Sequence, residues 1–238
     1  MLYLIGAGLW DEGDIALKGL EAARKCSRVY FERYTSLWKG DLEKIGLKAE
    51  DFARPDMEDN MSKLIGEAKE KDVCVLVPGD PLIATTHSSI ITEARKEGVK
   101  VEVIHSSSIF SALGETGLQV YKFGRTATIP HYETDAPYKI LEQNLWIGAH
   151  SLFLLDIQGQ ELMKCSEGLK KLLEMEGRGK KGIISEDTEV LVFCRAGSPE
   201  KALKWGKVRD FLDFDCTLCV IIVPGPLHFA EREYLEQL

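Results

Sequence analysis

The fold of this chain is decided by one stretch, VCVLVPGDPLIATTH, which runs from Val73 to His87. Its first five residues are all apolar, and such a run predicts a strand buried on both faces, as in a parallel sheet. Pro78, Gly79 and Pro81 then end the strand sharply, because proline cannot donate to a ladder and glycine tolerates positive φ. Asp80 therefore sits on a stiff turn at the carboxyl end of a buried strand, where open α/β sheets place their ligand crevice.

Strands and helices alternate through the rest of the first hundred residues, which predicts a parallel sheet covered by helices. Gly98 is the stop signal for a helix that begins at Ser88, and Asp11 or Asp14 is the expected cap of the first helix. The other elements are predicted from apolar periodicity: strands over 1–5, 29–31 and 100–104, and a helix over 61–71.

A Gly-x-Gly pair, Gly6 and Gly8, follows the first strand and suggests a dinucleotide-binding turn. The third glycine of that fingerprint is absent, and Asp11, Glu12 and Asp14 would repel a pyrophosphate at the helix start. We therefore reject a Rossmann domain. The two glycines still allow a small ligand to approach the backbone closely.

The second half of the chain has more varied strands and short connections, which are typical of a mixed sheet. We place the domain boundary so that residues 1–110 form one α/β domain and residues 111–238 a second. The predicted elements are strands over 123–129, 151–157, 189–194 and 217–223, helices over 136–146 and 161–175, and a loop over 177–182.

Composition narrows the class of protein. The chain has 238 residues, 45% of them hydrophobic and 29% charged, as in an ordinary globular protein. Its net charge of −8, without a basic stripe, argues against general nucleic-acid binding. No apolar run is long enough to span a bilayer and no basic region precedes the first strand, so we expect a cytoplasmic protein without a membrane partner.

The six cysteines mostly lie in apolar runs, so we expect reduced core residues rather than a disulfide framework. Cys216 and Cys219 form a Cys-x-x-Cys pair, but no second pair accompanies them, and core packing is the better interpretation. No cluster of His, Cys and Asp has metal-ligand spacing, so no metal is expected.

Several of these motifs, in this order, resemble the tetrapyrrole methylase superfamily. They are LIGAGL at 4–9, PGDP at 78–81, Ser108-Ile109 and Ala196-Gly197. Within it, the chain is most similar to the diphthine synthase family, through GDPLIATTH at 79–87, TGLQVYKFG at 116–124 and PGPLH at 224–228. The resemblance covers nearly the whole chain and implies a two-domain fold with the cofactor in a cleft between the domains.

The resemblance also implies an activity: N-methylation, by S-adenosylmethionine, of the amino group of a modified histidine on elongation factor 2, which gives diphthine. Elongation factor 2 is thus the implied protein substrate, and the family is usually a homodimer. By matching position, the implied cofactor contacts are Leu9, Asp80, Ile83, Ser108, Ile109, Leu155, Ala196 and His228. Most of them follow apolar strands, as a crevice at strand ends requires.

The residues by themselves leave alternatives open. Asp80 alone is also a good turn residue. His87, the candidate catalytic residue, is equally compatible with a base, a substrate ligand or a helix-cap partner, whereas His131 and His150 are expected at the surface. The alternative functions are a methylase of corrins or of ribosomal RNA, and a non-catalytic protein that binds S-adenosylmethionine.

Overall fold

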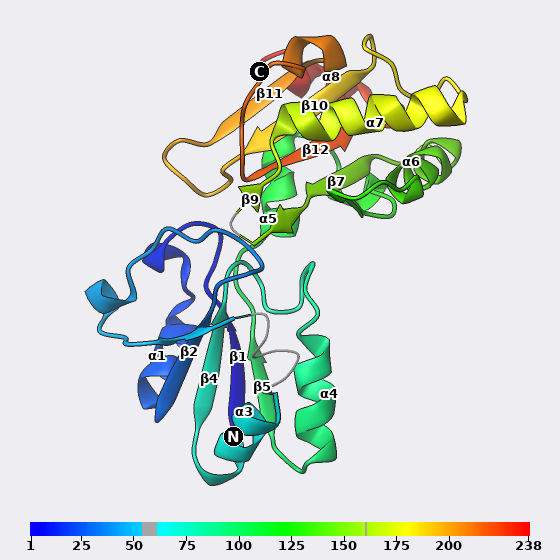
Figure 1. Ribbon diagram of the computed structural model, residues 1–238. Helices are drawn as coiled ribbons and strands as arrows, with labels where there is room; N and C mark the ends of the chain where they lie inside the picture. Colours follow the sequence, from blue (N-terminus) through cyan, green and yellow to red (C-terminus); the bar gives the residue numbers. More distant parts are fainter. Residues whose placement is uncertain (54–60, 160) are drawn as a thin grey trace. The chain divides into compact units, whose positions relative to one another are not determined.

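The structure is a computed structural model that describes residues 1–53, 61–159 and 161–238 (Figure 1). It forms two compact units, Met1–Ser111 and Ala112–Leu238, and the boundary placed after residue 110 lies one residue earlier. Each unit is built on its own five-stranded sheet.

The first unit has an all-parallel sheet in the order β3-β2-β4-β1-β5, so β4 is the central strand. The parallel N-terminal sheet predicted from the sequence is confirmed. Its elements are β1 (Leu2–Gly6), α1 (Leu17–Lys25), β2 (Arg28–Glu32), β3 (Glu50–Phe52), α3 (Met61–Glu70), β4 (Val73–Val77), α4 (Ser88–Lys96) and β5 (Val101–Ile104), followed by the short α5 (Ile109–Ala112).

Strand β4 is buried on both faces because successive side chains point to opposite sides of the sheet. Val73, Val75 and Val77 join one apolar cluster with side chains of α3 and α4. Cys74 and Leu76 join another cluster with side chains of α1. Full burial of such a side chain is worth about 1.5–3 kcal/mol, so the unbroken apolar run fixes β4 at the centre.

The second unit has a mixed sheet in the order β11-β10-β12-β7-β6, as predicted. Only the β6–β7 pair is parallel, and one large apolar cluster lies between this sheet and helices α6 and α7. The elements are β6 (Ala127–Ile129), α6 (Ala136–Trp146), β7 (Ser151–Leu155), β8 (Ile157–Gln158), β9 (Glu161–Leu162), α7 (Cys165–Gly179), β10 (Glu189–Cys194), β11 (Ala202–Lys207), β12 (Cys219–Val223) and α8 (Phe229–Leu235).

Two expectations about the second unit were wrong. The strand predicted over 123–129 is only Ala127–Ile129, because the Asn144 side chain bonds the Arg125 backbone in place of a neighbouring strand. The helix predicted over 161–175 begins at Cys165 and continues to Gly179, through part of the predicted loop. Gly168 within it has no side chain because a Cβ there would lie 2.7 Å from the side chain of Leu155.

The expected cap of the first helix was also wrong. Asp11 caps a 3-10 turn, Glu12–Asp14, by accepting a hydrogen bond from the Gly13 N–H. The carboxylate of Asp14 accepts from the backbone N–H of Trp10 instead. Helix α1 begins only at Leu17.

The cysteines are buried except Cys26, which is partly buried, and they show one difference from expectation. Cys216 and Cys219 are both buried in the apolar cluster of the second unit, as predicted. The structure joins Cys194 to Cys216 by a disulfide, whereas a reduced pair was expected. The register of the sheet explains the proximity, because Cys194 pairs with Cys219, three residues after Cys216. Among the described residues, no helix is long and apolar enough to cross a membrane.

Candidate functional site

The candidate site begins where β1 and β4 end side by side. The chains leaving the two strands are joined by a pair of backbone hydrogen bonds: the Gly8 N–H donates to the Gly79 carbonyl at 3.2 Å, and the Gly79 N–H to the Gly8 carbonyl at 2.7 Å. Because β1, β4 and β5 are parallel neighbours, their carboxyl ends lie at one edge of the sheet. We call this the carboxyl edge of the first unit.

Glycine is needed at this edge for two different reasons. A Cβ on Gly6 would lie 2.6 Å from the Gly79 carbonyl oxygen and 2.7 Å from Cβ of Ser106, so only glycine lets the three strand ends meet. Gly79 has a φ of +71°, and among the described residues a Cβ there would have only the Cβ of Ser108 within 4 Å, at 3.8 Å. The backbone of Gly79 is therefore open to close approach by a ligand.

Asp80 is the central charged group of the carboxyl edge. Its side chain is 6% exposed, and one carboxylate oxygen accepts a hydrogen bond from the Leu82 N–H at 3.0 Å. The other oxygen contacts Nδ1 of His105 at 2.7 Å and accepts from the Ser106 N–H at 3.3 Å. The carboxylate thus links the turn after β4 to the end of β5.

The structure brings five of the predicted cofactor contacts to this edge. Leu9 follows the Gly8–Gly79 hydrogen-bonded pair, and the Ile83 N–H donates to the Asp80 carbonyl at 3.3 Å. Ser108 is buried and donates its N–H to Ser111 Oγ at 2.9 Å, just before α5 opens at Ile109. These side chains come from three strand ends, which is why they are far apart in the sequence.

The other three predicted contacts lie in the second unit. Leu155 is the last residue of β7, and Ala196 follows the end of β10. Both strands run antiparallel to β12 between them, so Leu155 and Ala196 share one edge of that sheet. His228 follows the far end of β12, at the opposite edge, where its ring accepts a hydrogen bond from the Ala230 N–H and caps α8.

A buried carboxylate, Glu231, anchors the segment around His228. One of its oxygens accepts from the Gln119 N–H at 2.8 Å and contacts His150 Nε2 at 3.1 Å. The other accepts from Lys122 Nζ at 2.5 Å and from the His228 N–H at 2.7 Å. His150, expected at the surface, is instead fully buried here, because Glu231 and the Gly225 N–H bond its two ring nitrogens.

The charges of this cluster are set by the same contacts. Burial alone would raise the pKa of Glu231, but the hydrogen bonds from Lys122, Gln119, His228 and His150 outweigh it and lower this pKa to about 2. Burial lowers the pKa of His150, and the contact with Glu231 only partly offsets this. Since the Gly225 N–H donates to Nδ1, His150 is neutral and donates to Glu231 through Nε2.

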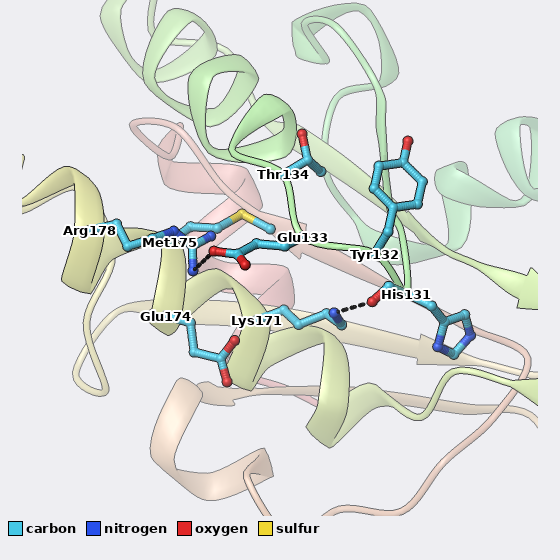
Figure 2. Close-up of a pocket in the computed structure, with 8 residues that line it drawn as sticks. All are labelled: His131, Tyr132, Glu133, Thr134, Lys171, Glu174, Met175 and Arg178. Atoms are coloured by element: carbon cyan, nitrogen blue, oxygen red, sulfur yellow. Dashed lines mark hydrogen bonds and ion pairs between the residues drawn. The ribbon is translucent and has the colours of Figure 1, made fainter.

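A pocket of about 250 Å³ lies in the second unit, where the chain leaves β6 (Figure 2). Its cations are engaged: Lys171 Nζ donates to the His131 carbonyl at 2.8 Å, and Arg178 pairs with Glu133 at 3.5 Å. Because β6 and β7 are parallel, this pocket lies at the same edge of the sheet as Leu155. The residues that line it are His131, Tyr132, Glu133, Thr134, Lys171, Glu174, Met175 and Arg178.

His87, the candidate catalytic residue, is fully buried, and both of its ring nitrogens are engaged. Nδ1 lies 3.2 Å from the Pro81 carbonyl, which only accepts, so Nδ1 carries the proton. Nε2 then accepts from the hydroxyl of Tyr34 at 3.1 Å. Burial lowers the pKa of His87 and keeps the ring neutral. It makes no side-chain hydrogen bond as a cap of α4, and its catalytic role stays a prediction.

Sequence reasoning missed two acidic residues, Glu32 and Glu231. Glu32 ends β2 and is fully buried at the carboxyl edge of the first unit. Glu231 stands three residues after His228, and this spacing is the one available signal for a capping box. Among the described residues, no group of three His, Cys, Asp or Glu side chains is arranged to hold a metal ion.

Comparisons with known proteins agree with this architecture. A family model of tetrapyrrole (corrin/porphyrin) methylases matches residues 1–211. A diphthine synthase of Methanocaldococcus jannaschii is 45% identical over 253 residues, covering 100% of this chain and 98% of that protein. One of Methanococcus maripaludis is 45% identical over 251 residues, with coverages of 100% and 98%. A crystal structure of diphthine synthase, 37% identical, matches with a TM-score of 0.92 over 99% of this chain and 94% of its own.

The chain belongs to the tetrapyrrole methylase family, and its α/β architecture is the fold of that family. Its place within the family is among the diphthine synthases. It is accordingly a methyltransferase, and its methyl donor is S-adenosylmethionine.

The residues of the carboxyl edge fit that donor. S-adenosylmethionine carries a positive sulfonium, and the buried carboxylate of Asp80 would offer a complementary charge to it. The open face of Gly79 offers backbone to a ligand at close range, and Leu9 and Ile83 supply partly buried apolar side chains beside it. A binding site for an amphipathic organic cation combines a carboxylate, accessible backbone groups and apolar side chains, and the carboxyl edge has all three.

Proposed function

We propose that this chain transfers methyl groups from S-adenosylmethionine to the amino group of the modified histidine of elongation factor 2, giving diphthine. The observation that carries this proposal is identity at 45% with diphthine synthases over the full length of the chain. The sequence similarity covers both units, so it includes the residues of each unit that would determine the choice of substrate.

The proposed donor-binding residues lie at one strand edge in each unit. In the first unit they are Leu9, Asp80, Ile83, Ser108 and Ile109, and in the second Leu155 and Ala196. His228 stays a prediction from the resemblance, since its ring already caps α8.

Catalysis by this chain is mainly a matter of orientation. When bound, S-adenosylmethionine supplies an electrophilic methyl group on a sulfonium, and the leaving thioether is neutral. The rigid turn Pro78–Pro81 and the Gly8–Gly79 pair then hold Asp80 in place, and alignment of two reactants contributes several kcal/mol to such a displacement. The attacking amine must lose its proton first, so the protein also needs a proton acceptor.

We also propose that the protein is a homodimer that works in the cytoplasm. The second unit exposes the large apolar side chains of Tyr121, Trp146, Ile147 and Phe229, and exposed apolar surface is typical of a protein interface. A net charge of −8 supports neither general nucleic-acid binding nor a ribosomal RNA substrate.

Mass spectrometry tests the proposed function directly. Elongation factor 2 that carries the unmethylated intermediate is incubated with this protein and S-adenosylmethionine. We expect mass gains in methyl steps on the modified histidine, with formation of S-adenosylhomocysteine. Donor binding by calorimetry without any mass gain would contradict the proposal and favour another substrate or a non-catalytic binding protein.

A further inference from the structure

Two buried side-chain polar atoms have no hydrogen-bond partner among the described residues, His131 Nε2 in the second unit and Glu32 Oε2 in the first, and only that of Glu32 lies at the carboxyl edge of the first unit. Glu32 is the last residue of β2 and is 0% exposed. Its Oε1 accepts hydrogen bonds from the backbone N–H groups of Tyr34 and Thr35, the latter at 2.6 Å. Its Oε2 is buried and has no hydrogen-bond partner among the residues that the structure describes.

The carboxylate of Glu32 therefore has one oxygen that is hydrogen-bonded and one that is not. Leaving a buried acceptor unpaired destabilises the folded state, and more strongly when the acceptor is charged, so native structures nearly always give such groups a partner. The two N–H groups fix the orientation of the carboxylate through Oε1, so Oε2 has a defined direction. A fixed carboxylate oxygen without a donor is suited to receive an ammonium group.

Glu32 belongs to the edge that carries the proposed donor site. Strands β2 and β4 are parallel neighbours, with Phe31 opposite Leu76, so Glu32 lies at the same edge as Asp80. The connection continues through side chains: the Tyr34 hydroxyl donates to His87, and His87 donates to the Pro81 carbonyl, next to Asp80. One hydrogen-bonded series therefore joins the Glu32 turn to the Asp80 turn.

We propose that Glu32 Oε2 binds the substrate amine as its ammonium and accepts one proton from it. This inference rests on the proposed function, whose substrate is a primary amine. The step is balanced: an N–H bond of the ammonium breaks, its electron pair stays on nitrogen, and the proton forms an O–H bond with Glu32. The freed electron pair then forms the N–CH₃ bond while the C–S bond breaks, and its electrons remain on sulfur.

The surroundings of Glu32 suit a proton acceptor better than those of His87. Burial raises the pKa of Glu32, which makes its carboxylate a stronger base, and the bonds from Thr35 and Tyr34 offset part of the rise. On the neighbouring β3, Asp51 is paired with Arg33 at 2.9 Å. Beyond β4, Asp80 contacts His105, and both nitrogens of His87 are engaged.

The test compares Glu32→Gln with a matched control, Glu67→Gln. Glu67 lies on α3 and accepts from the Tyr30 hydroxyl at 2.9 Å, so it is also a carboxylate bonded beside β2, but away from the carboxyl edge. Calorimetry without methyl donor measures the affinity of each variant for elongation factor 2 that bears the amine intermediate. A second titration measures affinity for S-adenosylmethionine, and transfer rates are measured from pH 7 to pH 9.5.

We expect Glu32→Gln to bind the amine-bearing factor at least about 10-fold more weakly and to keep its affinity for S-adenosylmethionine. Its transfer rate should be about 100-fold below that of the wild type at pH 7. The deficit should shrink as pH rises, because solvent then deprotonates the amine. Glu67→Gln should match the wild type in all three measurements.

Two results would overturn the inference while leaving the proposed function intact. One is a Glu32→Gln variant that binds and methylates the factor as the wild type does. The other is a deficit that does not change with pH and is accompanied by weaker binding of S-adenosylmethionine, which is the sign of a purely structural role. If Glu32→Gln does not fold, Glu32→Asp replaces it, and full affinity and rate in that shortened variant count against the inference. No transfer by the wild type would overturn the proposed function and this inference together.

Discussion

Asp80 is the residue on which the proposed donor site depends most. Its carboxylate contacts donors from the turn after β4 and from the end of β5, and it supplies the buried negative charge of the edge. We predict that Asp80→Ala weakens the binding of S-adenosylmethionine at least about 10-fold, since a hydrogen bond to a charged group is worth about 1.5–3 kcal/mol. Isothermal titration calorimetry measures this change.

The control for Asp80 is Asp51→Ala. Asp51 lies in the same unit, but its carboxylate is 70% exposed and pairs only with Arg33 among the contacts described. Exposed ion pairs of this kind are worth about 0–1 kcal/mol, so the control should bind the donor as the wild type does. Equal affinity of Asp80→Ala and Asp51→Ala for S-adenosylmethionine would show that Asp80 does not bind the donor.

At the scale of the element, helix α8 is held in place through its first turn, where the Glu231 carboxylate accepts hydrogen bonds from neighbouring segments. The helix spans only seven residues, too few to be stable alone, so its position depends on the bonds that Glu231 makes to Gln119, Lys122 and His150. The segments 116–124 and 224–228, on which the resemblance to diphthine synthases is based, meet at this carboxylate. The lysine at 122 is therefore explained by a structural need, whereas Gln119 and His228 contribute backbone N–H groups.

Acid should weaken this cluster in a defined pH range. The folded pKa of Glu231 is about 2, against an ordinary value of 4.5, so its stabilisation is complete above pH 4.5 and is lost as pH falls toward 2. The full loss is about 3 kcal/mol. His150 affects stability at higher pH than Glu231 does. Because its pKa in the folded chain is lowered from 6.5, the unfolded chain binds a proton at this residue more readily, and stability falls as pH drops below 6.5.

Urea unfolding at pH 7, 5 and 3.5 checks this prediction on Glu231→Gln. The variant should be less stable than the wild type at pH 7 by about 2–3 kcal/mol, because His150 and Lys122 lose a charged partner. The difference should narrow between pH 5 and pH 3.5, since the variant has no carboxylate to protonate. Glu233→Gln, an exposed substitution on the same helix, should follow the wild type at each pH. A constant difference across the three pH values would contradict the assignment.

At the scale of the whole molecule, the two units differ in how far their sequence predicts them. The first unit was predictable because a parallel sheet covered on both faces needs unbroken apolar runs, and β4 provides one. In the second unit β11 was missed, since its segment ALKWGK lies at a sheet edge and is nowhere fully buried. The role of Asn144 as partner of the Arg125 backbone depends on contacts 19 residues away, which no local pattern encodes.

The residues of the candidate site also differ in how far the sequence predicts them. Asp80 was predictable, because prolines on both sides and a preceding strand define its position from local sequence alone. Glu32 was not, because a glutamate after a short strand looks like a solvent-exposed end, and only the assembled sheet buries it. His150 was misplaced at the surface for a similar reason: its partners Gly225 and Glu231 are 75 and 81 residues away.

The last prediction concerns the assembly of two copies. Trp146 is 88% exposed at the end of α6, and Tyr121 is 88% and Phe229 75% exposed. Lys122 joins the segments of Tyr121 and Phe229 by donating to the Pro226 carbonyl, and a Cβ on Gly148, two residues after Trp146, would lie 3.9 Å from Pro226. A charge placed among these side chains would remain unpaired and poorly hydrated in a homodimer interface. We predict that Trp146→Glu converts a dimer of twice 26.6 kDa to a monomer in sedimentation velocity.

The comparison variant is Leu17→Glu, which adds the same charge at a leucine that is 70% exposed in the first unit. It should stay dimeric, and the far-ultraviolet circular dichroism of both variants should match the wild type. Trp146→Glu should also keep its affinity for S-adenosylmethionine, because Trp146 and Leu155 belong to opposite ends of the second sheet: α6 ends just before β7 begins at Ser151. A monomeric wild type, or a dimer that Leu17→Glu breaks and Trp146→Glu does not, would show that this apolar surface has another role.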